Sequence, residues 1–207
     1  MIEYLDYYDE NGNYLGYKTR EEVHKQGLWH NTVHAWLYDK EGNVYFQIRK
    51  ETKTFYTTAS GHVAKGETIN EAFAREINEE IGLTLDAKDA TFVDIKEFRM
   101  DKVKSDGTEF KDRAKSNIYI DLFEGNKNDF KFDESEVLGV VKVKAKDALE
   151  LFEKEEGKIE ASIITSGLNE NCVTSRKVDF AEFLVNKGET AIEKYGSILN
   201  KIIEVAN

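Results

Sequence analysis

Residues 68–81 constrain the fold most strongly, because they predict an amphipathic helix that must bury one side. At about 100° per residue, four apolar residues share one arc of such a helix. They are Ile69, Ala72, Phe73 and Ile77. Gly82 follows the last turn, where glycine commonly ends a helix. The chain therefore has to supply a sheet or further helices against which this apolar arc packs.

Three glutamates are placed unusually on this predicted helix. Glu76 and Glu80 fall inside the apolar arc, and Glu79 lies at its edge. The last helical turns already carry negative potential, and only Arg75 can compensate it locally. Buried carboxylates at this density either take up protons or bind a cation. Because oxygen ligands select hard divalent ions, the sequence predicts a Mg²⁺ or Mn²⁺ site.

The segment from Gly61 to Leu83 also forms a known motif. Gly61 is followed by Glu67 and then by the run REINEEIGL, which starts at Arg75. This segment resembles the Nudix box, G-x5-E-x7-R-E-U-x-E-E-x-G-U with U apolar, at every defined position. A chance match is on the order of one in a million for average amino-acid composition.

The resemblance implies a fold and a set of metal ligands. In Nudix hydrolases the box folds as loop, helix and loop within a mixed sheet that lies between helices. The metal ligands implied at the matching positions are the Gly61 carbonyl and the carboxylates of Glu76, Glu79 and Glu80. Glu67 is expected in the outer shell of the metal or in a pair with Arg75, which orients the carboxylates.

The resemblance also implies a reaction. Water attacks a phosphorus atom of a small-molecule diphosphate, and the metal stabilises charge on the phosphoryl oxygens and the leaving group. The expected substrate is a nucleoside diphosphate linked to another moiety. The expected catalytic residues are Glu76, Glu79 and Arg75, with Glu76 or Glu79 activating the water. Alternative acids for a base or metal-facing role are Glu109, Glu134 and Glu136.

Three histidines form a second pattern. His24, His30 and His62 lie in the stretches HKQGLWH and SGH. These stretches resemble type-1 isopentenyl-diphosphate isomerases, which share the Nudix fold and bind a metal through three histidines and two glutamates. The histidines are expected either to hold a second metal ion or to line the substrate pocket. In the second case Trp29 and Trp36 would join His30 and His62 in binding substrate, by stacking on a base or covering an apolar tail.

Departures from the isomerase pattern favour hydrolysis. Ser60 stands where the isomerases have an acid/base cysteine, and a serine hydroxyl cannot replace a thiol in proton transfer to carbon. Asp112 and Ala114 are the best counterparts of the acidic metal pair, so at least one ligand is missing. The isomerase is the first alternative function. A Nudix sensor without catalysis is the second, although a sensor has no need to keep all the box glutamates.

The remaining sequence predicts a mixed sheet with flanking helices, an α/β or α+β domain. Strands are predicted at residues 3–8, 14–18, 31–38, 43–50, 90–100, 116–123 and 137–143. Further helices are predicted from Thr19 to Gly27 and at residues 145–155, 180–186 and 190–206. Residues 159–164 fit either structure, and Lys104 and Ser105 begin a polar loop.

These elements divide the chain into three predicted regions. Residues 1–29 form an N-terminal hairpin and helix, residues 30–165 the Nudix domain, and residues 166–207 a C-terminal helical extension. The extension carries an apolar stripe that is more typical of a core or homodimer contact than of a ligand site. The stripe consists of Ile192, Tyr195, Ile198, Leu199 and Ile202.

Composition excludes some functions. The formal net charge of −11 argues against a general nucleic-acid surface, which needs clustered Lys and Arg. A nucleotide substrate stays compatible, because a bound divalent ion can reverse the local field. The acidic N-terminus lacks the apolar stretch of a signal peptide, and no run of about 18 apolar residues predicts a membrane span. With Cys172 as the only cysteine, no intrachain disulfide can form. We therefore expect a cytoplasmic protein.

Overall fold

The computed structural model describes residues 2–103 and 106–206. The strands are β1 (Tyr4–Tyr8), β2 (Tyr14–Thr19), β3 (His30–Tyr38), β4 (Asn43–Arg49), β5 (Phe55–Tyr56), β6 (Ala59–His62), β7 (Thr91–Val103), β8 (Glu109–Leu122), β9 (Val137–Lys144), β10 (Lys158–Thr165) and β11 (Cys172–Asp179). The α-helices are α1 (Arg20–Gln26), α2 (Ile69–Ile81), α3 (Ala145–Lys154) and α4 (Ala191–Val205). Two single-turn 3-10 helices are η1 (Lys127–Asp129) and η2 (Phe180–Glu182).

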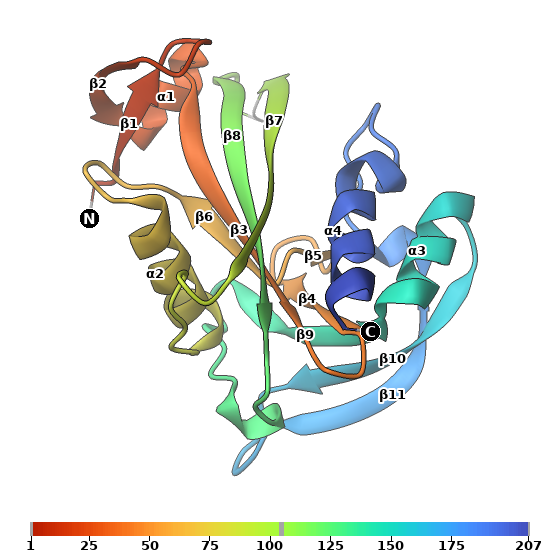
Figure 1. Ribbon diagram of the computed structural model, residues 1–207. Coiled ribbons are helices and arrows are strands. Elements are labelled where there is room, and N and C mark those ends of the chain that lie inside the picture. Colours follow the sequence, from red (N-terminus) through yellow and green to blue (C-terminus); the bar gives the residue numbers. More distant parts are fainter. Residues whose placement is uncertain (1, 104–105, 207) are drawn as a thin grey trace.

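One mixed sheet organises the fold (Figure 1). Among the described residues it has nine strands, in the order β11-β10-β9-β4-β3-β8-β7, with β5 paired to β4 and β6 paired to β3. β3 and β8 run parallel, whereas the other neighbours are antiparallel. β3 pairs with β4 only at Leu37 and Tyr38, and with β6 from Thr32 to Ala35. The divergence of β4 from β3 thus makes room for β6, which begins the predicted metal site.

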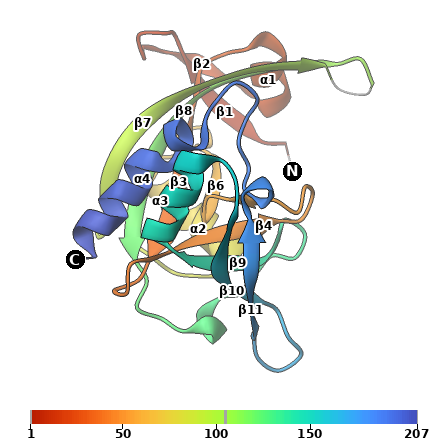
Figure 2. The ribbon, with the colours of Figure 1, turned by 90° about the vertical axis from the view of Figure 1, so that its right-hand side faces the viewer.

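Helices cover both faces of this sheet. Helix α2 lies on one side, and α3 and α4 lie together on the other (Figure 2). Successive residues of β3 point to opposite faces. Val33 and Ala35 therefore pack in the core beneath α2, and Trp36 packs in the core beneath α3 and α4. The predicted mixed sheet between helices is confirmed.

Helix α2 forms as its sequence predicts. The Thr68 hydroxyl accepts a hydrogen bond from the Glu71 amide, and the Glu71 carboxylate accepts one from the Thr68 amide. Gly82 ends the helix in the left-handed region, with φ 71°. A Cβ atom at Gly82 would also overlap Lys131, so glycine is needed for space as well as for conformation. Ala72, Phe73 and Ile77 of the apolar arc are buried, as expected, and Ile69 is half-buried against the same core.

The N-terminal hairpin and helix also match their predictions. β1 and β2 pair antiparallel, and α1 runs from the Thr19 cap to Gly27, which has φ 64°. Leu5 is completely buried and forms an isolated bridge with Ala64, between β6 and α2. Tyr8 forms a similar bridge with Trp29, just before β3. The hairpin therefore rests directly on the segments that lead into the site.

The C-terminal region differs from its prediction, because it is not wholly helical. β11 pairs with β10 along its whole length and extends the main sheet. Only Val178 of β11 is buried, so the strand shows none of the apolar alternation by which a strand is predicted. The predicted helix at residues 180–186 is wrong beyond η2, because the Leu184 amide donates instead to the Phe55 carbonyl. Residues 159–164, which fitted either structure, lie in β10.

Helix α4 buries the predicted apolar stripe. Tyr195, Ile198, Leu199 and Ile202 belong to the core, so the core interpretation of the stripe is confirmed. Strands β7 and β8 are longer than predicted, because their ladder continues to the pair Val103 and Glu109. Lys104 and Ser105 of the predicted loop lie outside the described residues. No helix within residues 2–103 and 106–206 is long and apolar enough to cross a membrane.

Candidate active site

A pocket of about 610 Å³ opens between α2, β6 and the diverging strands β3 and β4. Its lining includes six of the residues predicted from the sequence: Gly61, His62, Arg75, Glu76, Glu79 and Glu80. The residues come from β6 and from the last two turns of α2. The fold therefore brings Gly61 and the polar box residues of α2 to one cavity, as the amphipathic pattern of α2 requires.

Arg75 connects the glutamates of the box. Its Nε atom lies 2.7 Å from one oxygen of Glu67, and its Nη2 atom lies 2.9 Å from the other. Its Nη1 atom lies 2.6 Å from Glu76 Oε1 and 2.9 Å from Glu79 Oε2. Nη2 also donates to the His62 carbonyl at 2.8 Å. The hydrogen bond to Glu67 contributes most to raising the pKa of Arg75, so this side chain stays charged. The Glu67–Arg75 pair, one of the two roles expected for Glu67, is present.

Glu80 is held from two sides. Its Oε2 atom accepts hydrogen bonds from the Ser60 amide at 2.8 Å and from the Gln47 side chain at 3.2 Å. Glu80 is only 8% exposed, and this burial raises the pKa of its carboxyl to about 8. The prediction that Glu80 faces inward is therefore confirmed. The carboxyl must lose its proton before it can bind a cation.

Glu76 is pressed against the backbone of β6. A Cβ atom added to Gly61 would lie 2.5 Å from Glu76 Oε2 and closer still to the other carboxyl atoms. Glycine at this position is what allows the carboxylate to reach the strand. Burial raises the pKa of Glu76, against the opposing effect of Arg75. The juxtaposition of Gly61 and Glu76 brings two of the predicted metal ligands together.

Glu79 is more accessible than the other two carboxylates. Its side chain is 60% exposed, against 13% for Glu76. Its hydrogen bond to Arg75 leaves the carboxylate at the solvent side of the pocket. The position of Glu79 at the edge of the apolar arc is thus as the sequence predicts.

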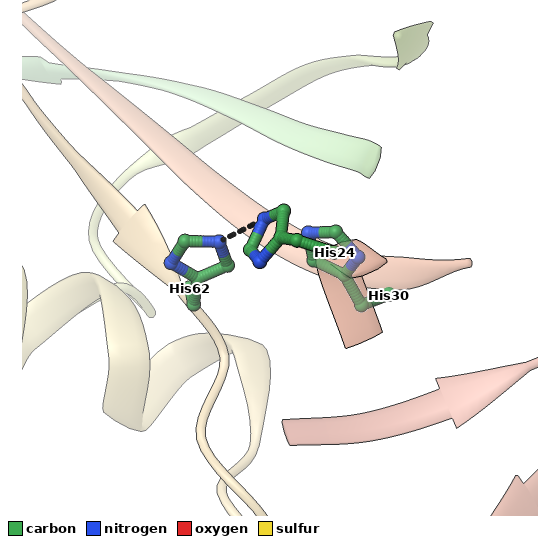
Figure 3. A group of neighbouring side chains, drawn as sticks. All are labelled: His24, His30 and His62. Carbon is green, nitrogen blue, oxygen red and sulfur yellow. Dashed lines mark hydrogen bonds between the residues drawn. The ribbon is translucent and has the colours of Figure 1, made fainter. Parts of the chain in front are cut away.

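The three histidines of the second pattern also meet. His24 from α1, His30 from β3 and His62 from β6 converge on one point (Figure 3). Nε2 of His24 and Nε2 of His62 are 3.4 Å apart. Two nitrogen ligands of one tetrahedral ion lie about 3.4 Å apart, from metal–nitrogen bonds of about 2.1 Å. Each of the three histidines offers one ring nitrogen, and these three atoms all lie within 4.8 Å of one another.

The hydrogen bonds of the rings favour metal binding. Nδ1 of His24 contacts the Arg20 carbonyl at 2.8 Å, and Nδ1 of His30 contacts the Leu28 carbonyl at 3.0 Å. A carbonyl only accepts, so each Nδ1 carries a proton, and in the neutral form of either ring the lone pair lies on Nε2. Burial lowers the pKa of His30, and it lowers the pKa of His62 to about 2. The rings of His30 and His62 are therefore neutral, which is the form that binds metals.

Asp112 adds a carboxylate to this cluster. Its Oδ1 atom lies 3.5 Å from His30 Nε2 and 3.9 Å from His24 Nε2. Among the described residues, Asp112 Oδ1 and His30 Nε2 are both buried without a hydrogen bond. Such orphaned polar atoms need a partner. Three imidazoles and one carboxylate fit a first-row divalent metal, so these residues suit a second metal site.

Neither tryptophan lines the pocket. Trp36 is 1% exposed, and its ring packs against Phe46 and Tyr195. It shares a face of β3 with His34, but α4 covers that part of the face. The ring of Trp29 is 5% exposed, with the Arg99 guanidinium 4.7 Å from its centroid. The structure therefore places neither ring at the surface of the pocket, because both are closed off by other side chains.

Several pocket residues were not predicted to belong to the site. Gln47 and Arg49 of β4 line it, and so does His34 of β3. Of the three alternative acids, Glu136 alone belongs to the described lining. Glu109 instead pairs with Lys111 at 2.7 Å. No local motif marks Gln47 or Arg49, because the sheet brings them to the box from another part of the chain.

Comparisons with known proteins agree with this geometry. The family model described as the NUDIX domain matches residues 28–162. An uncharacterized Nudix hydrolase of Clostridium acetobutylicum is 33% identical over 153 residues, which cover 68% of this chain and 69% of that protein. An isopentenyl-diphosphate Delta-isomerase of Serratia proteamaculans is 29% identical over 89 residues, covering 41% of this chain and 50% of that protein.

The fold is also shared with a solved structure. The crystal structure of DR0079 from Deinococcus radiodurans has a TM-score of 0.52 and 17% identity, covering 73% of this chain and 90% of that one. The family model spans more than half of the chain and includes the whole box. The chain therefore belongs to the Nudix family of hydrolases, enzymes that cleave diphosphate bonds.

Proposed function

We propose that this protein hydrolyses a diphosphate bond of a small molecule and requires Mg²⁺ or Mn²⁺. The observation that carries the proposal is the convergence of Glu76, Glu79 and Glu80 with the backbone of Gly61 at one pocket. Burial disfavours the charged forms of Glu76 and Glu80, and a nearby cation would restore them. When bound, a divalent cation would stabilise negative charge on the phosphoryl oxygens.

The glutamates of the box differ in how exposed they are and in which groups they contact. Glu80 is buried and held by Gln47 and the Ser60 amide, and Glu76 is half-buried and held by Arg75, which suits metal ligands. We assign activation of the attacking water to Glu79, because its carboxylate is the most accessible of the three. Glu67 acts through Arg75 and is a positioning residue.

A second candidate function is the isomerisation of isopentenyl diphosphate. The convergence of His24, His30 and His62 beside Asp112 favours it. Ser60 counts against it, because no thiol stands at this position for proton transfer to carbon. A non-catalytic sensor would use the same pocket without turnover.

The test is a panel of diphosphate compounds with Mg²⁺ or Mn²⁺, run on wild type, Glu79→Gln and Glu204→Gln. We expect phosphate or monophosphate release by wild type and a loss of at least 100-fold in Glu79→Gln. Glu204→Gln makes the same charge change on the exposed side of α4 and should keep full activity. Full activity in Glu79→Gln would refute the assignment of the base.

A parallel incubation with isopentenyl diphosphate in deuterated water separates the alternatives. Hydrolysis predicts no deuterium in the carbon skeleton, whereas an isomerase incorporates it. Nucleotide binding without any turnover would instead favour the sensor. The nucleoside part of the substrate stays a prediction.

A further inference from the structure

The lining of the pocket is polar throughout its described part. It consists of charged, hydroxyl, amide and imidazole side chains and Gly61, with no Phe, Tyr, Trp or aliphatic side chain. Sites that bind a nucleobase usually offer an aromatic or apolar surface for its flat face. A purine or pyrimidine in this pocket would lose its water without gaining such a surface.

Aromatic rings next to the pocket already have cations on them. The Arg49 guanidinium lies 5.6 Å from the centroid of Tyr56, and Lys194 Nζ lies 5.0 Å from the same centroid. Trp29 has Arg99 at 4.7 Å and Lys115 at 5.6 Å. A base could stack on either ring only by displacing a cation, which costs about 0.5–2 kcal/mol for each cation–π contact.

Arg49 lines the pocket, and among the described residues its guanidinium contacts the ring of Tyr56 and pairs with no carboxylate. It follows Gln47 by two residues on the same face of β4, so it stands about 7 Å along the strand from the residue that binds Glu80. In the part of the chain that the structure describes, Arg49 forms no ion pair. The other arginines of the pocket, Arg20 and Arg75, are both paired with glutamates. An anionic group is the partner that a guanidinium in this position lacks.

We propose that the group joined to the scissile diphosphate is a hydroxylated moiety with a second anionic substituent, a phosphate or a carboxylate, and that Arg49 binds this substituent. The inference rests on the proposed hydrolase function and replaces the nucleoside of the predicted substrate. The carboxylates of α2 and the Arg49 guanidinium then contact opposite ends of one ligand. His34, which also lines this part of the pocket, adds a ring nitrogen for a hydroxyl group.

Two compounds of similar size test the proposal. In ADP, ribose links a diphosphate to adenine, and in 5-phosphoribosyl 1-diphosphate it links a diphosphate to a second phosphate. We expect kcat/KM to be at least tenfold higher for the second compound. Diadenosine diphosphate, with a nucleoside at both ends, should be hydrolysed least. A matched ribosyl diphosphate with a carboxylate in place of the 5-phosphate shows which anion is preferred.

Variants locate the contact. Arg49→Gln should raise KM for the phosphorylated compound at least tenfold, and change that for ADP less than threefold. Arg176→Gln is the control, because it removes a guanidinium that lies beside the ring of Phe55 on an exposed part of β11. It should change the KM of neither compound. Thermal unfolding of each variant verifies that it is folded.

The outcomes separate this inference from the function on which it rests. Release of neither phosphate nor AMP from any of the compounds, with either ion, contradicts the hydrolase itself. A preference for ADP or diadenosine diphosphate leaves the hydrolase intact and overturns the inference. An equal loss for ADP and the phosphorylated compound in Arg49→Gln overturns the role of Arg49.

Discussion

Gly61→Ala separates the arrangement of the site from the stability of the fold. The added methyl carbon would lie 2.5 Å or less from three atoms of the Glu76 carboxyl, whereas ordinary contacts begin at 3.4 Å. The carboxylate therefore has to move by about 1 Å or more from its place against β6. Because the clash is with the end of a flexible side chain, the backbone of β6 can stay where it is.

The magnitudes expected for activity and stability differ widely. A displacement of about 1 Å in a catalytic group costs on the order of 100-fold in rate. Changing the rotamer of Glu76 costs about 0.5–1.5 kcal/mol, which lowers the melting temperature by only a few degrees in a chain of this size. We therefore expect a loss of about 100-fold in kcat with a nearly unchanged melting temperature.

The assay measures metal-dependent hydrolysis and thermal unfolding on the same preparations. Gly196→Ala is the control, because it adds the same methyl group in α4, where the nearest neighbour is Ile192 at 3.4 Å. This control should keep its activity and gain about 0.5–1 kcal/mol of stability, the usual difference between alanine and glycine in a helix. Wild-type activity in Gly61→Ala would refute the reasoning, since Glu76 would then have no need of its place beside the strand.

Three further predictions concern protonation, the core and the histidines. Burial raises the pKa of Glu80 to about 8 in the fold, so between pH 4.5 and 8 only the unfolded chain gives up this proton. The metal-free protein should therefore lose stability as pH rises through this range. In thermal unfolding with EDTA, the melting temperature should fall less steeply with pH for Glu80→Gln than for wild type. Equal slopes would contradict the raised pKa of Glu80. Trp36→Phe should lower the free energy of unfolding by about 1–2 kcal/mol in chemical denaturation and leave KM unchanged, because the ring belongs to the core. A raised KM would show that Trp36 contacts the substrate. His24→Gln should weaken Zn²⁺ binding at least tenfold in calorimetric titrations, and unchanged affinity would show that the cluster binds no metal.

The part of the site that lies on one helix could be predicted from the sequence. The spacing of Ile69, Phe73 and Ile77 fixes which side of α2 is buried, and the same 100° step places Glu76 and Glu80 on that side. The helix ends are encoded equally locally, by the glycine caps of α1 and α2. These features depend on neighbours within four residues, which a sequence displays directly.

The rest depends on contacts between distant segments. Gln47 reaches Glu80 across 33 positions of sequence, and nothing around Gln47 marks it as a site residue. Trp36 shares a strand face with a pocket residue, and only the packing of Tyr195 from α4 decides that its ring is closed off. β11 is held by backbone pairing with β10, so its exposed side chains carry no strand signal.

The central position of β3 has a consequence for the spacing between the histidine cluster and the pocket. His30 and His34 point to the same face of this strand, four residues and about 13 Å apart. Hydrogen-bonded neighbours on both sides prevent the strand from stretching or sliding. His30 is closed to solvent, whereas His34 lines the pocket, so the strand sets how far the histidine cluster lies from this side of the pocket. The position of a metal ion in the cluster relative to His34 would then be fixed by the strand itself and need no closing loop.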